Sequence, residues 1–158
     1  MPRRSVKPDK NVWFLSRERA GLTREAASAA MEYISEDRIQ RIESDKSSPH
    51  PDEVLAMARV YHDPILTNLY CTQECPIGEK YVPKISQSEL SAIVLEILDS
   101  VRGLEGCRDR LVEIAADGVI SREERPDLEK IAGQLERVSA AASTLRLWME
   151  QKLDQPEA

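Results

Sequence analysis

Three short helical patterns follow one another between residues 12 and 44, and the connections between them are too tight for strands. Gly21 can end the first helix, because glycine adopts the left-handed conformation at little cost. Thr23 and Ser35 can each cap the helix that follows through a side-chain oxygen, and acidic residues in the next turn suit the positive end of the helix dipole. The sequence therefore predicts a compact helical bundle that presents one helix, residues 36–44, to a partner.

The same stretch carries a set of small, apolar and capping residues in a familiar order. They are Gly21-Leu22-Thr23-Arg24-Glu25-Ala26-Ala27, Ile34-Ser35, Ile39, Ile42-Glu43 and Pro49. On these residues, positions from about 11 to 61 resemble the Cro/repressor-type (Xre-like) family of bacterial and phage transcriptional regulators. The resemblance implies a lambda-repressor-like helix-turn-helix domain that binds double-stranded DNA, and it covers about a third of the chain.

Two features depart from the family pattern. The chain is one residue longer than the usual spacing between Thr23 and Ser35, and Met31-Glu32-Tyr33 stands where the family commonly has a turn glycine. The sequence therefore predicts a reshaped turn ahead of the outward helix.

Side chains on the outward helix are the candidates for reading DNA sequence. In helix-turn-helix proteins the amino-terminal part of this helix meets base edges in the major groove. Arginine can bridge two acceptors on guanine, glutamine can pair with adenine, and a carboxylate can accept from cytosine. The base-edge candidates are Glu36, Asp37, Arg38, Gln40 and Arg41, and we favour the last three. The alternative is that Glu36 and Asp37 only stabilise the helix dipole and that Arg41 is a solvated surface charge.

Binding to the phosphate backbone depends on local placement of charge. Residues 1–84 hold 13 Lys and Arg against 13 Asp and Glu, so this part of the chain has no net charge with which to attract phosphates. A basic arm that includes Lys7 and Lys10 could follow the backbone or enter a minor groove, although a disordered solubilising tail is an equal alternative. Helix caps and the turn after the outward helix add polar groups, for which an ordinary polar turn is the alternative. The phosphate candidates are Thr23, Arg24, Ser35, Lys46, Ser47, Ser48, Arg3 and Arg4.

Cys71 and Cys75 lie four residues apart in a segment that proline and glycine punctuate. A closed zinc site needs four ligands, and the remaining candidates, His50, His62 and Cys107, have no familiar paired spacing. A thiol switch is a second alternative. We favour a packing role, because free cysteine is commonly a small buried hydrophobe. No metal site and no cofactor are therefore predicted.

The second half of the chain predicts two long helices over residues 86–153. Ser86-Gln87-Ser88-Glu89 and Ser121-Arg122-Glu123-Glu124 are capping-box patterns, and Asp117-Gly118 ends the first helix. Gly103 and Gly106 indicate a bend or a close helix contact within the first helix. The turn lacks the alternating acidic ligands of a calcium loop. The short connection makes these helices an antiparallel hairpin.

A hairpin of two helices buries too little apolar surface to be stable alone. A second copy would complete a four-helix bundle and present two outward helices to the halves of a palindromic operator. The alternative is a monomer in which the hairpin folds back on the first domain. Residues 85–158 hold 9 Lys and Arg against 15 Asp and Glu, so this half should repel DNA. The dimerisation candidates are Leu90, Val94, Ile97, Val101, Leu128, Leu135, Val138, Leu145 and Trp148.

The expected fold class is all-α. We expect a basic arm and helix-turn-helix domain over 1–66, a linker containing Cys and Pro over 67–85, and a helical hairpin, the dimerisation domain, over 86–153. No enzyme activity is predicted, because the sequence lacks a phosphate-binding glycine loop, a metal triad and a nucleophile motif. No stretch is long and apolar enough for a membrane helix or a secretion signal, so we expect a cytoplasmic protein without a membrane partner.

The functional expectation is a sequence-specific DNA-binding transcriptional regulator, a repressor that acts as a homodimer through the hairpin. The alternative is a protein-interaction adaptor that keeps the helix-turn-helix scaffold without binding specific DNA. The absent turn glycine and the zero net charge of residues 1–84 favour that alternative.

Overall fold

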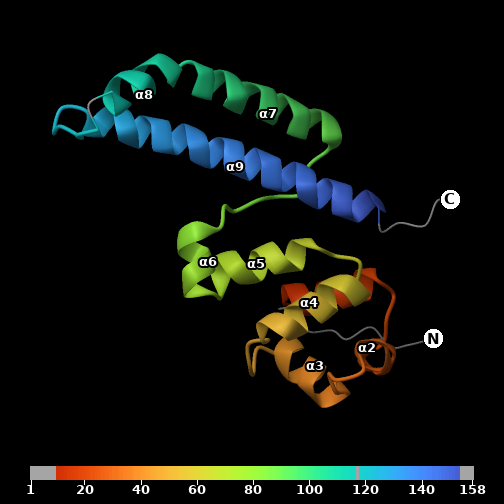
Figure 1. Cartoon of the computed structure of the whole chain (residues 1–158). Coiled ribbons are helices and arrows are strands. Elements are labelled where there is room, and N and C mark those ends of the chain that lie inside the picture. Colours follow the sequence, from red (N-terminus) through yellow and green to blue (C-terminus); the bar gives the residue numbers. More distant parts are fainter. Residues whose placement is uncertain (1–9, 117, 154–158) are drawn as a thin grey trace. The chain divides into compact units, whose positions relative to one another are not determined.

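The computed structural model describes residues 10–116 and 118–153, and every regular element in that part of the chain is a helix. The chain divides into two compact units, with the boundary between Val82 and Pro83 (Figure 1). The expected all-α fold, with a helix-turn-helix arrangement followed by a hairpin, is confirmed. Within the described ranges, no helix is both long and apolar enough to cross a membrane.

The first unit is built from six helices. They are α1 (Val12–Arg19), α2 (Arg24–Met31), α3 (Glu36–Glu43), α4 (Pro51–Val60), α5 (Ile65–Gln73) and α6 (Pro76–Tyr81). The predicted helix end and caps are present. Gly21, just after α1, is in the left-handed region with φ of 71°. Thr23 Oγ1 accepts from the N–H of Ala26 at 3.1 Å, and Ser35 Oγ accepts from the N–H of Arg38 at 3.2 Å.

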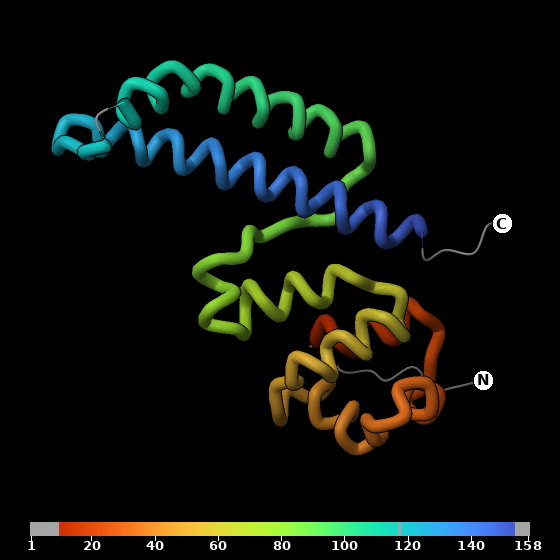
Figure 2. Tube along the Cα trace, in the orientation of Figure 1, coloured from red at the N-terminus to blue at the C-terminus, as the bar shows by residue number. Residues whose placement is uncertain are grey.

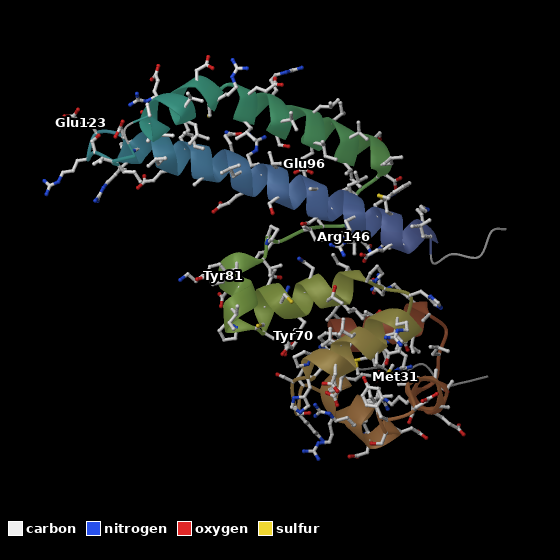
Figure 3. The ribbon with its side chains drawn as sticks, viewed as in Figure 1. Met31, Tyr70, Tyr81, Glu96, Glu123 and Arg146 are labelled. Carbon is white, nitrogen blue, oxygen red and sulfur yellow. The ribbon has the colours of Figure 1, made fainter. Side chains whose placement is uncertain are left out.

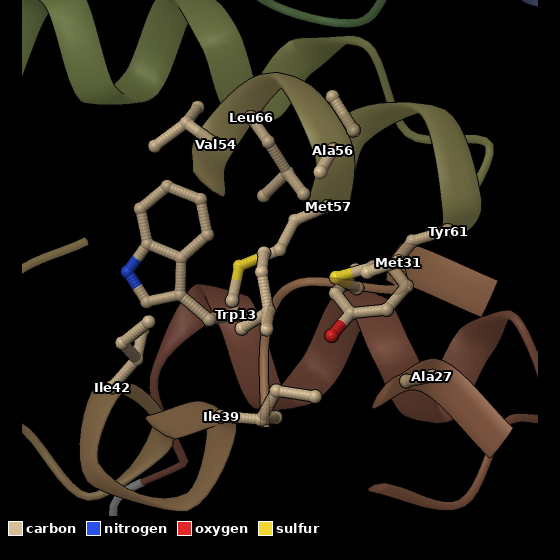
Figure 4. Packing of buried hydrophobic residues seen from close by; sticks show 12 residues of the cluster. Trp13, Ala27, Met31, Ile39, Ile42, Val54, Ala56, Met57, Tyr61 and Leu66 are labelled. Carbon is tan, nitrogen blue, oxygen red and sulfur yellow. The ribbon is translucent and has the colours of Figure 1, made fainter. Parts of the chain in front are cut away.

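The core of this unit forms between the first five helices, α1 to α5. Trp13 from α1 packs beside Ile42 of α3 and Met57 of α4, and Leu66 of α5 closes the cluster (Figure 4). Ile39 and Ile42 are fully buried, so the apolar side of α3 faces inward. The opposite side of α3 is therefore the one that a partner can reach.

Residues 67–85, expected as a linker, are largely helical. They hold most of α5 and all of α6, and Pro76 occupies the first turn of α6, where a missing N–H has no cost. The backbones of α5 and α6 approach closely at Gly78. A Cβ added there would lie 2.1 Å from the carbonyl oxygen of Cys71. Cys71 and Cys75 are free and half-buried. Among the described residues, no group of three His, Cys, Asp or Glu side chains is arranged to hold a metal.

The second unit is an antiparallel hairpin in which α7 (Leu90–Glu105) and α8 (Arg108–Ala115) run against α9 (Arg125–Leu153) (Figure 2). The first capping box was wrong: α7 begins at Leu90, and Glu89 precedes it without a side-chain cap. The predicted single helix is also broken after Gly106, where Cys107 begins a new turn as the residue before α8.

The second capping box is confirmed immediately before α9. The N–H of Ser121 donates to the Glu124 carboxylate at 2.8 Å, and the N–H of Glu124 donates to Ser121 Oγ at 3.3 Å. Both groups of the box are therefore satisfied at the end of the hairpin turn.

Candidate nucleic-acid interface

Helix α3 is polar on its outer side, and its inner side packs against the core. Glu36, Asp37, Gln40 and Arg41 are exposed. Four of the five base-edge candidates thus share the surface of one helix. Their backbone is held by the Ser35 cap at one end and by the buried isoleucines underneath.

Arg38, the fifth base-edge candidate, is half-buried and is bonded within the domain. Its Nε and Nη2 donate to the Glu53 carboxylate at 2.7 and 2.6 Å, so α3 is tied to α4. Its Nη1 donates to Ser47 Oγ, and its Nη2 to the carbonyl oxygen of Ser48 at 3.0 Å. The guanidinium therefore fixes the turn between α3 and α4, and a contact of Arg38 with a base stays a prediction.

This ion pair changes the titration of its carboxylate. Burial raises the pKa of Glu53, but the hydrogen bonds from Arg38 and from the backbone N–H of His50, together with the Arg38 charge, outweigh it. The pKa of Glu53 consequently lies below its ordinary value, and that of Arg38 lies above. The pair stays fully charged at neutral pH.

A second ion cluster lies under the opposite edge of α3. Arg17 is buried and binds Glu43 through Nε and through Nη2, the latter at 3.0 Å, while its Nη1 donates to the carbonyl oxygen of Leu22. Arg24 joins the cluster: its Nε donates at 2.7 Å to Glu43 Oε2, the oxygen that also accepts from Arg17 Nη2. Arg24, expected at a phosphate, is therefore half-exposed but already paired.

Asn11 fastens the start of α1 to the end of α3. Its Oδ1 accepts from the N–H of Phe14 at 3.1 Å, and its Nδ2 donates to the carbonyl oxygen of Ile42 at 2.7 Å and to Asp45 Oδ1 at 2.8 Å. The left-handed Asp45, with φ of 55°, is held by this bond. Asn11 was missed at the sequence level, although an asparagine before an apolar helix is a capping signal.

The turn before α3 places a glutamate where the related family commonly has glycine. Glu32 occupies the glycine position with φ of 62°, a conformation that is strained for any residue with a Cβ. Ser28 Oγ donates to the carbonyl oxygen of Ile34 at 2.8 Å. Tyr33 Oη donates to the carbonyl oxygen of Asp52 at 2.9 Å, which ties the turn to α4.

Few cations on this surface are free to meet phosphates. Arg41 and Lys46 are exposed and form no ion pair with any residue in the described part of the chain. Thr23 and Ser35 are exposed beside them as helix caps, and Ser48 is exposed in the turn after α3. Ser47 is half-buried against Arg38. The predicted contacts of Arg3 and Arg4 lie outside the described residues.

Comparison with known proteins identifies one region of the chain. Residues 15–63 match the helix-turn-helix domain family. They extend from within α1 to just past α4 and so include the contacts around α3 described above, except those of Asn11. No curated protein and no solved structure matches the chain.

Proposed function

We propose that this chain, which carries a helix-turn-helix domain over residues 15–63, is a sequence-specific DNA-binding regulator of transcription. The observation that carries the proposal is that Gln40 and Arg41 are exposed on the outer side of α3, where their side chains form no hydrogen bond or ion pair with the described residues. Arg38, Asn11 and Glu43 hold that helix in place from beneath. Preorganised side chains lose little freedom on binding, so such a surface suits recognition.

In the proposed mechanism α3 enters the major groove. Gln40 pairs with an adenine and Arg41 with a guanine, and Glu36 or Asp37 accepts from a cytosine amino group. Lys46 and the amide groups at the starts of α2 and α3 meet phosphates on either side. Arg38 acts as a positioning residue, because its contacts set the path of the turn that carries Lys46.

We further propose that the protein belongs with the Cro/repressor-type (Xre-like) regulators and acts in the cytoplasm as a dimeric repressor. The residues that resemble that family support this placement, and occupancy of a promoter by a dimer would exclude transcription. A single copy offers few free cations, so two copies on a palindromic site would double the phosphate contacts.

The second candidate is a protein-interaction adaptor. The zero net charge of residues 1–84 and the two exposed carboxylates at the start of α3 favour it, because both weaken attraction to phosphates. An adaptor would use the same outer side of α3 to bind another protein.

Selection of bound sequences from a random duplex DNA pool by the purified full chain tests the proposal. We expect an enriched palindrome, and an affinity for it that falls steeply as salt rises, by a slope of about −0.9 per phosphate contact. Arg41→Ala should relax selection at one base pair in each half-site. Arg59→Ala, which removes an equally exposed arginine from α4, is the matched control. A folded protein that enriches no sequence would favour the adaptor.

A further inference from the structure

The long helix α9 carries an apolar seam that its own chain covers only in part. Leu135, Val138, Ala142, Leu145 and Met149 alternate at spacings of three and four, the pattern of a helix that packs along a partner helix. The α9 residues buried beyond Ile131 are instead Ala141, Thr144 and Leu147, which lie on a neighbouring strip. Leu135 and Met149 remain 49% and 48% exposed.

Helix α7 likewise carries apolar residues outside the strip that packs against α9. Ile93 and Ser100 are its buried residues, and they mark the side that packs against α9. Val94 and Val101, each displaced by one residue from that side, are both 42% exposed, and Leu98 is exposed beyond them. The apolar arc of α7 is therefore wider than the strip that α9 covers.

Two hollows lie along the hairpin beside the uncovered apolar side chains of α7 and α9. One, of about 360 Å³, is lined by apolar side chains that include Val101, Leu111 and Leu135. The other, of about 290 Å³, is lined by apolar side chains that include Val138, Ala142 and Leu145. Both hollows are lined by residues of α7 and α9, and we term the two together the hairpin groove.

We propose that the hairpin groove is the docking site for the same groove of a second copy, which packs antiparallel to form a four-helix bundle. The inference rests on the dimeric form of the proposed function and supplies its interface. The heptad spacing on α9 calls for a helix in the groove, and a second copy brings a helix with the matching seam.

The size of the uncovered surface suits this occupant. Seven apolar side chains of the hairpin each keep between 39% and 58% of their surface exposed: Leu90, Val94, Leu98, Val101, Leu111, Leu135 and Met149. A standard interface buries about 800 Å² from each partner, and these side chains are the apolar surface that a second copy would bury.

The charges at the rim favour the antiparallel orientation. Glu105 and Arg108 both border the hollow near the end of α7, and Arg146, which pairs with Glu150, borders the other hollow. Arg146 is labelled on α9 in Figure 3. In an antiparallel pair, Arg146 of the partner subunit would face this rim of mixed charge. A parallel pair would instead oppose Arg146 to the same residue of its partner, and like charges across an interface are unfavourable.

Sedimentation equilibrium of the full chain over a hundredfold range of concentration tests the proposal. We expect a species of twice the chain mass of 17.9 kDa that dissociates on dilution. Leu135→Glu should weaken this association by about tenfold or more, because it places a charge in the seam. Ala132→Glu adds the same charge at an exposed position of α9 that lines neither hollow, and it should change the association by less than about twofold.

Charge exchange at exposed positions tests the orientation without disturbing the hairpin core. Glu105→Arg should weaken association by about threefold, and adding Arg146→Glu should restore it. A double variant that is no better than the single one would overturn the antiparallel orientation. A wild-type chain that stays monomeric throughout would overturn the interface itself.

Failure of this inference is separable from failure of the proposed function. A monomeric wild-type chain that still selects a half-site would leave DNA recognition intact and remove only the interface. A wild-type chain that is dimeric but selects no DNA, and that becomes monomeric with Leu135→Glu, would establish the interface and count against the regulator.

Discussion

Arg38 and Glu53 form a two-pronged ion pair, with nitrogen-to-oxygen distances of 2.7 and 2.6 Å, that joins the outward helix α3 to α4. The pair converts a residue expected at the DNA into part of the frame that presents its neighbours. Arg41, three residues further on, has no such partner among the described residues. Substitution of Arg38 should therefore destabilise the domain, whereas substitution of Arg41 should not.

Arg38→Ala should lower the free energy of unfolding of the helix-turn-helix domain by about 2 kcal/mol, because it leaves the Glu53 carboxylate poorly solvated and without its main donor. Arg41→Ala should leave it within about 0.5 kcal/mol of the wild type, as expected for an exposed side chain. Urea denaturation followed by circular dichroism measures both. Equal loss in the two variants would contradict the role assigned to Arg38.

Acid should weaken the domain through Glu53. Because the folded-state pKa of this carboxyl lies below its ordinary value of 4.5, the ionised pair contributes its full stability above that pH. The contribution is lost as pH falls through the lower, folded-state pKa. Melting temperature measured in steps from neutral pH downward should therefore fall more steeply for the wild type than for Glu53→Gln, which cannot titrate. Parallel curves for the two proteins would count against the ion pair.

Glu32→Gly should stabilise the domain. Glu32 has φ of 62° and ψ of −46°, and the N–H of Tyr33 donates to the carbonyl oxygen of Met31 across it. Such a sparsely populated conformation costs about 1–3 kcal/mol for a residue with a Cβ. The added freedom of glycine in the unfolded chain offsets up to about 1 kcal/mol of the gain from removing the Cβ. We expect a net gain of about 0.5–1 kcal/mol in the free energy of unfolding. Glu32→Ala removes the same carboxylate but keeps the Cβ, so it should show no such gain in the same thermal melts.

Gly78→Ala should destabilise the first unit by about 2 kcal/mol, because the new Cβ would meet the Cys71 carbonyl and force α5 and α6 apart. Gly133→Ala is the matched control within α9, where nothing lies within 4 Å of an added Cβ. There alanine should stabilise its helix by up to about 1 kcal/mol. Chemical denaturation of each variant measures the two opposite changes.

The sequence anticipated the parts of the fold that depend on neighbouring residues. Gly21, Thr23 and Ser35 act within one helical turn of their own positions, so their roles could be predicted from local chemistry alone. The second capping box, Ser121 with Glu124, is equally local and is present.

Roles that depend on distant partners could not be predicted in this way. Arg38 meets a carboxylate fifteen positions away, and nothing near it in the sequence distinguishes an inward from an outward guanidinium. Ser86 fits a capping box, yet α7 begins only at Leu90. The segment around Pro76 was expected to be a linker because proline punctuates loops, but proline also fits the first turn of a helix, as it does in α6.

The buried core of the second unit is small: Ile93, Cys107, Ile114, Ile131, Ala141 and Leu147 are its buried apolar residues in the described part. If the hairpin groove is closed only by a second copy, part of the free energy of folding of this unit comes from association, and its melting temperature rises with protein concentration. The fraction of chains that are both folded and paired would then increase more steeply than protein abundance. Occupancy of an operator would in turn respond sharply to how much of the protein the cell makes.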